Sequence, residues 1–115
     1  MHDAIAVLSG SLGMTIAIVH GYLGETKVVR PLTNLPPSSK RVLHAVMFLS
    51  AVYWFLGGAA LALSPFAGSG GRWLTALIVA MVYLTAALAN LWATRGRHFG
   101  WILLSVAGAL ALFSV

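Results

Sequence analysis

Two histidines and one glutamate are the residues of this chain whose types could support chemistry inside or beside apolar segments. His20 and Glu25 stand near the end of the first apolar run, and His44 stands at the start of the second. Neutral imidazoles on two helices can ligate haem iron axially, and imidazole with carboxylate suits zinc, iron or copper. Ionisable groups within a membrane also mark proton pathways and quinone sites. His20 and His44 are therefore metal or haem candidates, and Glu25 is a candidate for proton transfer or contact with a lipid headgroup.

Asn90 and His98 are expected at the same depth in the membrane as His20, Glu25 and His44. Asn90 precedes the end of the third apolar run by one turn, and His98 follows in the next loop. Because successive membrane helices alternate in direction, these polar residues all reach one side of the bilayer, where proton transfer or headgroup contact is open to them. We favour a structural role, in which His20 and Asn90 bond neighbouring helices and His44 and Glu25 meet headgroups and loop cations. Two histidines on separate helices have no diagnostic spacing.

Enzymatic catalysis is not indicated by the remaining polar residues. A hydrolase needs a nucleophile, a base and an orienting partner, whereas Ser9, Ser50 and Ser105 are expected to have no histidine or acid at their depth. The chain has no cysteine, which excludes thiolate nucleophiles, iron–sulfur clusters and cysteine-ligated zinc. We therefore expect a protein without enzymatic activity.

Composition dictates the elements that position these residues. Of the 115 residues, 60% are hydrophobic and only 8% are charged, with a mean hydropathy of +0.94. Soluble domains carry about 25% charged residues and depend on them for their surface. A membrane span takes about 20 apolar residues. In lipid, an α-helix satisfies its backbone hydrogen bonds within one segment, whereas an open sheet would leave backbone groups unpaired. We predict an all-α integral membrane four-helix bundle, with residues 1–115 as a single transmembrane domain.

The expected spans cover residues 4–24, 42–63, 73–93 and 99–115. Prolines are expected to break any helix in the loop 25–41, and the loop 64–72 is expected to be flexible because it is rich in glycine and serine. The loops 25–41 and 94–98 contain six of the seven Lys and Arg residues: Lys27, Arg30, Lys40, Arg41, Arg95 and Arg97.

These six cations indicate the orientation of the chain. By the positive-inside rule, both basic loops are cytoplasmic and both termini lie on the outer, periplasmic side of a bacterial inner membrane. The same cations can contact anionic lipids. Nucleic acid is not an expected partner, because the cations occupy short loops instead of one exposed face.

Small residues are expected to pack the helices together, since lipid gives no hydrophobic drive for association and close contact must replace it. Gly13, Ala17 and Gly21 recur every four residues in the first run. Gly58 and Gly108 lie on comparable stripes of the second and fourth runs. These stripes predict a compact bundle.

The segment from His20 to Glu25, with the sequence His-Gly-Tyr-Leu-Gly-Glu, resembles the His-x-x-Leu-Gly-Glu ending of the first helix in a group of uncharacterised small bacterial four-helix integral membrane proteins. This resemblance implies the same membrane fold and draws attention to His20 and Glu25, but it implies no established activity. Relatives often carry Trp-His where this chain has Met47-Phe48. A two-histidine site on the first two helices would therefore need His44 as the second ligand.

The expected function is that of a small non-enzymatic inner-membrane protein, a subunit or accessory component of a larger membrane assembly or a homo-oligomer. Its partners would be the lipid bilayer and other membrane subunits or further copies of itself. One alternative is a haem-, metal- or quinone-binding protein that uses the polar layer around His20. Another is a small proton-coupled transporter. On the main interpretation no cofactor is needed, and haem or a transition metal belongs to the first alternative.

Overall fold

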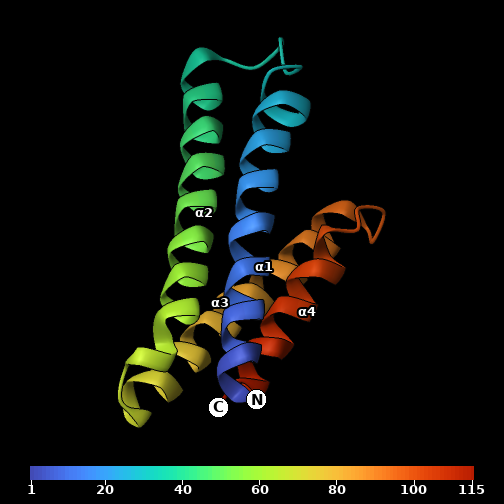
Figure 1. Ribbon diagram of the computed structural model, residues 1–115. Helices are drawn as coiled ribbons and strands as arrows, with labels where there is room; N and C mark the ends of the chain where they lie inside the picture. Colours follow the sequence, from blue (N-terminus) through green and yellow to red (C-terminus); the bar gives the residue numbers. More distant parts are fainter.

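The computed structural model describes residues 1–115 as four α-helices (Figure 1). These are α1 (His2–Leu23), α2 (Pro37–Leu63), α3 (Ser69–Thr94) and α4 (Gly100–Phe113). A π-helical segment, η1 (Gly24–Val29), extends α1, and a 3-10 turn, η2 (Ser64–Phe66), extends α2. The prediction of an all-α fold with four helices is confirmed.

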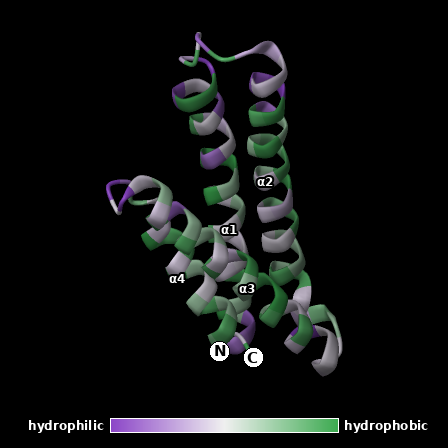
Figure 2. Ribbon diagram, turned by 180° about the vertical axis from the view of Figure 1, so that it is seen from behind, coloured by the Kyte–Doolittle hydropathy of each residue, from purple (hydrophilic) through white to green (hydrophobic).

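Three of the helical segments are long and apolar enough to cross a membrane: His2–Val29, Pro37–Phe66 and Ser69–Thr94, with 28, 30 and 26 residues. The fourth helix, α4, has 14 residues, which is about 21 Å of helix against a hydrocarbon core of about 30 Å. Figure 2 shows hydrophilic residues concentrated at the loop ends and near the termini, with apolar residues along the helices. The fold is therefore compatible with a membrane protein.

The helices form two antiparallel hairpins, α1–α2 and α3–α4, with α1 packed against both α2 and α4. The two termini lie side by side at one end, where the hairpins meet (Figure 1). Toward the other end the α3–α4 hairpin leans away from α1–α2, so the two connecting loops are well separated (Figures 1 and 2). The bundle is thus compact at the terminus end and open at the loop end, which the sequence did not predict.

Direct backbone contact joins α1 and α2. A Cβ atom on Gly58 would lie 2.6 Å from the carbonyl oxygen of Gly10 and 2.9 Å from the amide nitrogen of Met14. Such distances leave room only for glycine. On the neighbouring face of α1, a Cβ on Gly13 would lie 2.6 Å from Cζ of Tyr83, the largest fully buried side chain of the core.

The other small residues singled out in the sequence also lie where helices approach. Ala17 is 1% exposed. A Cβ on Gly21 would lie 3.2 Å from the Cβ of Ala51 in α2, and one on Gly108 would lie 2.8 Å from Cγ of Leu84 in α3. Glycine and alanine therefore determine how closely α1 approaches α2 and how closely α4 approaches α3.

Arg72, in the first turn of α3, ties both chain ends to the rest of the fold. Its Nε and Nη2 donate hydrogen bonds to the carbonyl oxygen of Ser114, at 3.0 and 2.6 Å, and its Nη1 forms an ion pair with Asp3. The last carbonyls of a helix have no partner within the helix, so Arg72 satisfies an acceptor at the end of α4. Arg72 is the remaining one of the seven Lys and Arg residues of the chain, and nothing in the sequence pattern indicated this role.

The loops are shorter than predicted. The predicted loop 25–41 is helical at both ends, because η1 continues to Val29 and α2 begins at Pro37. Proline is compatible with the first turn of a helix, where its missing N–H is not needed. Likewise, the predicted flexible loop 64–72 contains η2 and the start of α3 at Ser69. Proline and glycine in these stretches therefore mark helix starts as well as breaks.

The neighbouring glycines of α2 provide a matched test of the α1–α2 contact. We predict that Gly58→Ala destabilises the protein by about 1–3 kcal/mol, because the added methyl group overpacks a backbone contact. Gly57→Ala should be neutral or slightly stabilising, since its Cβ would meet its nearest neighbour, Val79, at an ordinary 3.7 Å. Unfolding in mixed micelles, followed by circular dichroism, measures both. Equal unfolding midpoints for the two variants would contradict the contact.

Candidate functional site

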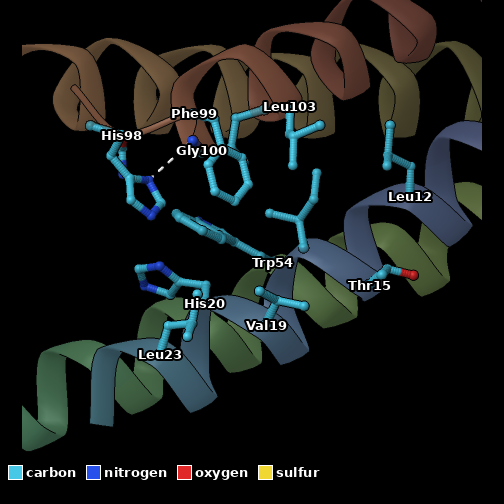
Figure 3. A pocket seen from close by; sticks show the side chains of 13 residues that line it. Leu12, Thr15, Val19, His20, Leu23, Trp54, His98, Phe99, Gly100 and Leu103 are labelled. Carbon is cyan, nitrogen blue, oxygen red and sulfur yellow. Dashed lines mark hydrogen bonds between the residues drawn. The ribbon is translucent and has the colours of Figure 1, made fainter. Parts of the chain in front are cut away.

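A cavity of about 330 Å³ lies between the two hairpins, toward the open loop end. Its size falls in the range of small-molecule sites. The side chains that line it divide into an apolar set, Leu12, Ile16, Val19, Leu23, Leu103 and Leu104, and a polar and aromatic set, His20, Trp54, Asn90, His98 and Phe99. Figure 3 shows the two histidines at one end of the cavity and Leu12 and Thr15 at the other. The two histidines therefore mark one end of a predominantly apolar cavity.

Aromatic rings form the polar end of the cavity. The His20 ring packs against Trp54 with ring centroids 4.4 Å apart, and His98 stacks on Phe99 at 4.9 Å. The indole of Trp54 lies between the His20 ring and the rings of His98 and Phe99, which precede α4 (Figure 3). The sequence analysis did not include Trp54 or Phe99, because a tryptophan in the middle of a span is usually a packing residue and nothing in its spacing relates it to His20.

The protonation pattern of the neutral His20 ring follows from its neighbour Ser50. The Ser50 hydroxyl donates to the carbonyl oxygen of Met47 at 2.9 Å, and a serine has only one proton to donate. With the hydroxyl proton on the shorter contact to Met47, the imidazole donates in the 3.1 Å contact between His20 Nε2 and Ser50 Oγ. We therefore expect the proton of neutral His20 on Nε2 and a free lone pair on Nδ1.

The expectation that Ser50 has no histidine at its depth is wrong. Depth was counted from the predicted span ends, but α1 continues through η1 to Val29 and α2 begins at Pro37, which brings His20 and Ser50 to the same level. The pair nevertheless lacks the orienting acid of a catalytic triad, because no Asp or Glu side chain forms an ion pair with His20.

His98 and Asn90 complete the polar end. The backbone N–H of Gly100 donates to His98 Nδ1 at 3.1 Å, so a neutral His98 carries its proton on Nε2 and can donate from it. A Cβ on Gly100 would lie 2.8 Å from that Nδ1, so glycine is required for this contact. The side-chain oxygen of Asn90 is buried without a hydrogen-bond partner, which costs about 1–3 kcal/mol unless a ligand or water supplies one.

His44 and Glu25 lie outside this cavity. His44 Nδ1 is 2.7 Å from Glu25 Oε2, and Arg30 Nε is 3.4 Å from the other carboxylate oxygen. The π-helical segment η1 contains Glu25, and its wider turn changes the direction of side chains relative to an α-helix. These three groups are about 36–70% exposed. Glu25 and His44 line a separate, smaller hollow between α1 and α2.

The structure therefore does not bring His20 and His44 together. His20 faces the cavity between the hairpins, whereas His44 pairs with Glu25 on the other side of α1. No group of three His, Asp or Glu side chains is arranged to hold a metal ion. The separation also removes Glu25 from the His20 cavity. A shared metal or haem site of the two histidines is not what this geometry provides.

The six loop cations lie at the open end of the fold. Lys27 and Arg30 belong to or follow η1, and Lys40 and Arg41 lie in the first turns of α2. Arg95 and Arg97 lie in the turn before α4, where Arg95 has a positive φ of 51° and Gly96 one of 74°. All six are exposed or partly exposed. They are placed to meet lipid headgroups or water and not the cavity.

A scan against protein-family models and searches among curated proteins and solved structures find no match to this chain. The resemblance of the segment from His20 to Glu25 to small bacterial four-helix membrane proteins therefore stays an expectation. What the cavity binds follows from its own geometry.

We predict that neutral His20 carries its proton on Nε2. Nitrogen-15 NMR of the imidazole ring in detergent micelles reports this tautomer directly. Ser50→Ala should remove the preference for it and destabilise the protein by about 0.5–1.5 kcal/mol, the typical value of one hydrogen bond. His44→Ala is the matched control and should leave the His20 signals unchanged. A proton on Nδ1 in the wild-type protein would contradict the assignment.

Proposed function

We propose that this protein is a non-enzymatic integral membrane protein that binds a membrane-dissolved amphiphile with a ring-shaped headgroup. The single observation that carries this proposal is the cavity between the hairpins, with an apolar wall at one end and aromatic and hydrogen-bonding side chains at the other. This develops the quinone-binding alternative of the sequence analysis.

The affinity of such a site must come from its polar end. An amphiphile already dissolved in lipid gains little from moving its hydrocarbon chain onto Ile16, Val19 or Leu103, because lipid is as apolar as these side chains. A headgroup gains more, since hydrogen bonds are electrostatically stronger in a medium of low dielectric. The rings of Trp54 and Phe99 add stacking contacts that suit a flat headgroup.

A neutral organic ring fits this cavity better than a metal or haem. His20 Nε2 is already bonded to Ser50, and no group of three His, Asp or Glu side chains is placed to hold a metal ion. No lysine or arginine lines the cavity, so an anionic headgroup would lack a counter-charge. A neutral ring with oxygen substituents and a hydrocarbon chain, as in the quinone class, needs neither metal ligands nor a positive counter-charge.

A role as a subunit of a larger assembly or as a homo-oligomer is a second candidate, and α2 supports it. Of its 27 residues only Gly58 and Leu61 are buried. Its outer face and that of α1 form a shallow apolar hollow with Gly21 and Ala51 at its floor and Phe48 at its rim. Small residues in such a hollow suit close packing of another helix in the membrane.

We further propose that the protein crosses a bacterial inner membrane four times, with both termini outside. The six cations at the loop end support this orientation, as does the position of both termini at the opposite end (Figure 1). The fourth crossing would consist of α4 together with the residues around Phe99 that precede it. α3 would pack against this shorter segment within the membrane.

The orientation is tested by a reporter that is active only in the cytoplasm. Fused after Val115, it should be inactive, and inserted near Asn34 in the first basic loop, it should be active. Because positive charge determines the orientation, replacing the cations of that loop by neutral residues should weaken the difference. An active fusion after Val115 would contradict the proposed topology.

Binding is tested with an alkyl benzoquinone and its hydroquinone, added to the protein in lipid nanodiscs. At least one of the two forms should bind with about one molecule per chain. Val19→Trp fills the cavity and should weaken that binding by about tenfold or more, which corresponds to 1.4 kcal/mol. Equilibrium dialysis measures the bound fraction.

The matched control is Val46→Trp, which places the same side chain on the exposed face of α2 and should bind like the wild type. If neither form of the probe binds, or if the three proteins bind equally, the cavity is not the binding site.

A further inference from the structure

The hydrogen-bonding groups at the polar end of the cavity have defined roles, and these roles specify the ligand more narrowly than its shape does. The inference rests on the proposed binding function. It concerns which oxidation state of a ring-bearing amphiphile the site accepts. Three side chains matter, His20, Asn90 and His98, all of which line the cavity.

Two of these groups are acceptors. His20 holds its proton on Nε2, which donates to Ser50, so Nδ1 has a free lone pair. Asn90 contributes a buried side-chain oxygen that has no partner. The terminal torsion of an asparagine side chain is soft, so a small rotation presents this oxygen to a molecule in the cavity. Of the two, the Asn90 oxygen is buried without a partner and therefore requires a donor from the ligand.

The third group is a donor. His98 accepts the N–H of Gly100 on Nδ1, which leaves the proton of the neutral ring on Nε2. Figure 3 shows the His98 ring directed toward Trp54 and His20. The polar end therefore offers these two acceptors together with N–H donors from His98, the Asn90 amide nitrogen and the Trp54 indole.

We propose that this site binds the hydroxyl-bearing, reduced form of a ring-shaped amphiphile, a hydroquinone, in preference to the oxidised dione. A phenolic hydroxyl can donate to Asn90 or His20 and accept from His98 with the same oxygen. A dione carbonyl has only lone pairs, so it can accept from His98 but leaves the Asn90 oxygen unpaired. An unpaired buried acceptor is the larger penalty, and it falls on the oxidised form alone.

The preference has a redox consequence that needs no electron transfer by the protein. A site that binds the reduced form more tightly makes reduction of the bound couple easier. For a two-electron couple, a tenfold preference raises the midpoint potential of the bound molecule by about 30 mV. The protein would therefore bind and retain hydroquinone in the membrane without oxidising it.

The test compares three ligands with the same alkyl chain: the hydroquinone, the benzoquinone and the dimethyl ether of the hydroquinone. All are added to the wild-type protein in lipid nanodiscs, and binding is measured by equilibrium dialysis. The dimethyl ether keeps the ring and its oxygens but cannot donate. We expect the hydroquinone to bind at least about tenfold more tightly than either of the others.

Two variants locate the origin of the preference. Asn90→Leu replaces the unpaired acceptor by an apolar side chain of similar branched shape and should reduce the preference to about twofold or less. Thr15→Val is the matched control, because Thr15 lines the same cavity but its hydroxyl already donates to the carbonyl oxygen of Ser11. This control should keep the preference of the wild type.

Equal binding of hydroquinone and dimethyl ether to the wild-type protein would overturn the inference, as would tighter binding of the dione. Retention of the full preference in a folded Asn90→Leu variant would also overturn it. These outcomes leave the proposed binding function standing, because a ligand still occupies the cavity. Failure of all three ligands to bind would instead refute the binding function itself.

Discussion

Backbone contact between Gly10 and Gly58 is the constraint on which the rest of this fold depends. In lipid, apolar surface gives helices no reason to associate, so contact between small residues and a few polar bonds determines where they meet. The glycine contact fixes the crossing of α1 and α2, and Arg72 ties both chain ends together at the terminus end. Both constraints act far from the connecting loops. The hairpins can therefore separate at the loop end, and the cavity lies where they do.

The polar residues derive their roles from that separation. His20 bonds to Ser50 of the neighbouring helix α2, as the sequence analysis favoured. The Asn90 oxygen, in contrast, has no partner where the hairpins separate. A buried group left without a partner in an otherwise satisfied structure is a site for a ligand or water. The apolar lining of the cavity and this unpaired oxygen support the proposal of an amphiphilic ligand.

Composition and periodicity were sufficient to predict four helices and the small residues between them, because both depend only on local sequence. The same information singled out His20 as a position of interest. It could not show which side chains share a cavity, since this depends on the rotation of each helix and on the angle between the hairpins. The π-helical segment directs Glu25 to His44 and not to His20, and no sequence pattern marks it. Trp54 was not singled out for the same reason, because the side chains around it come from other helices.

The separation of the hairpins is the central claim, and pulsed electron paramagnetic resonance on spin-labelled protein in nanodiscs tests it most directly. The chain has no native cysteine, so labels attach only where cysteines are introduced. One pair, at Leu8 and Leu112, reports the terminus end, and a second pair, at Val28 and Arg97, reports the loop end. All four side chains are exposed. The open fold gives a short distance for the first pair and a clearly longer one for the second. Similar distances for both pairs would mean a closed, parallel bundle with no cavity between its hairpins.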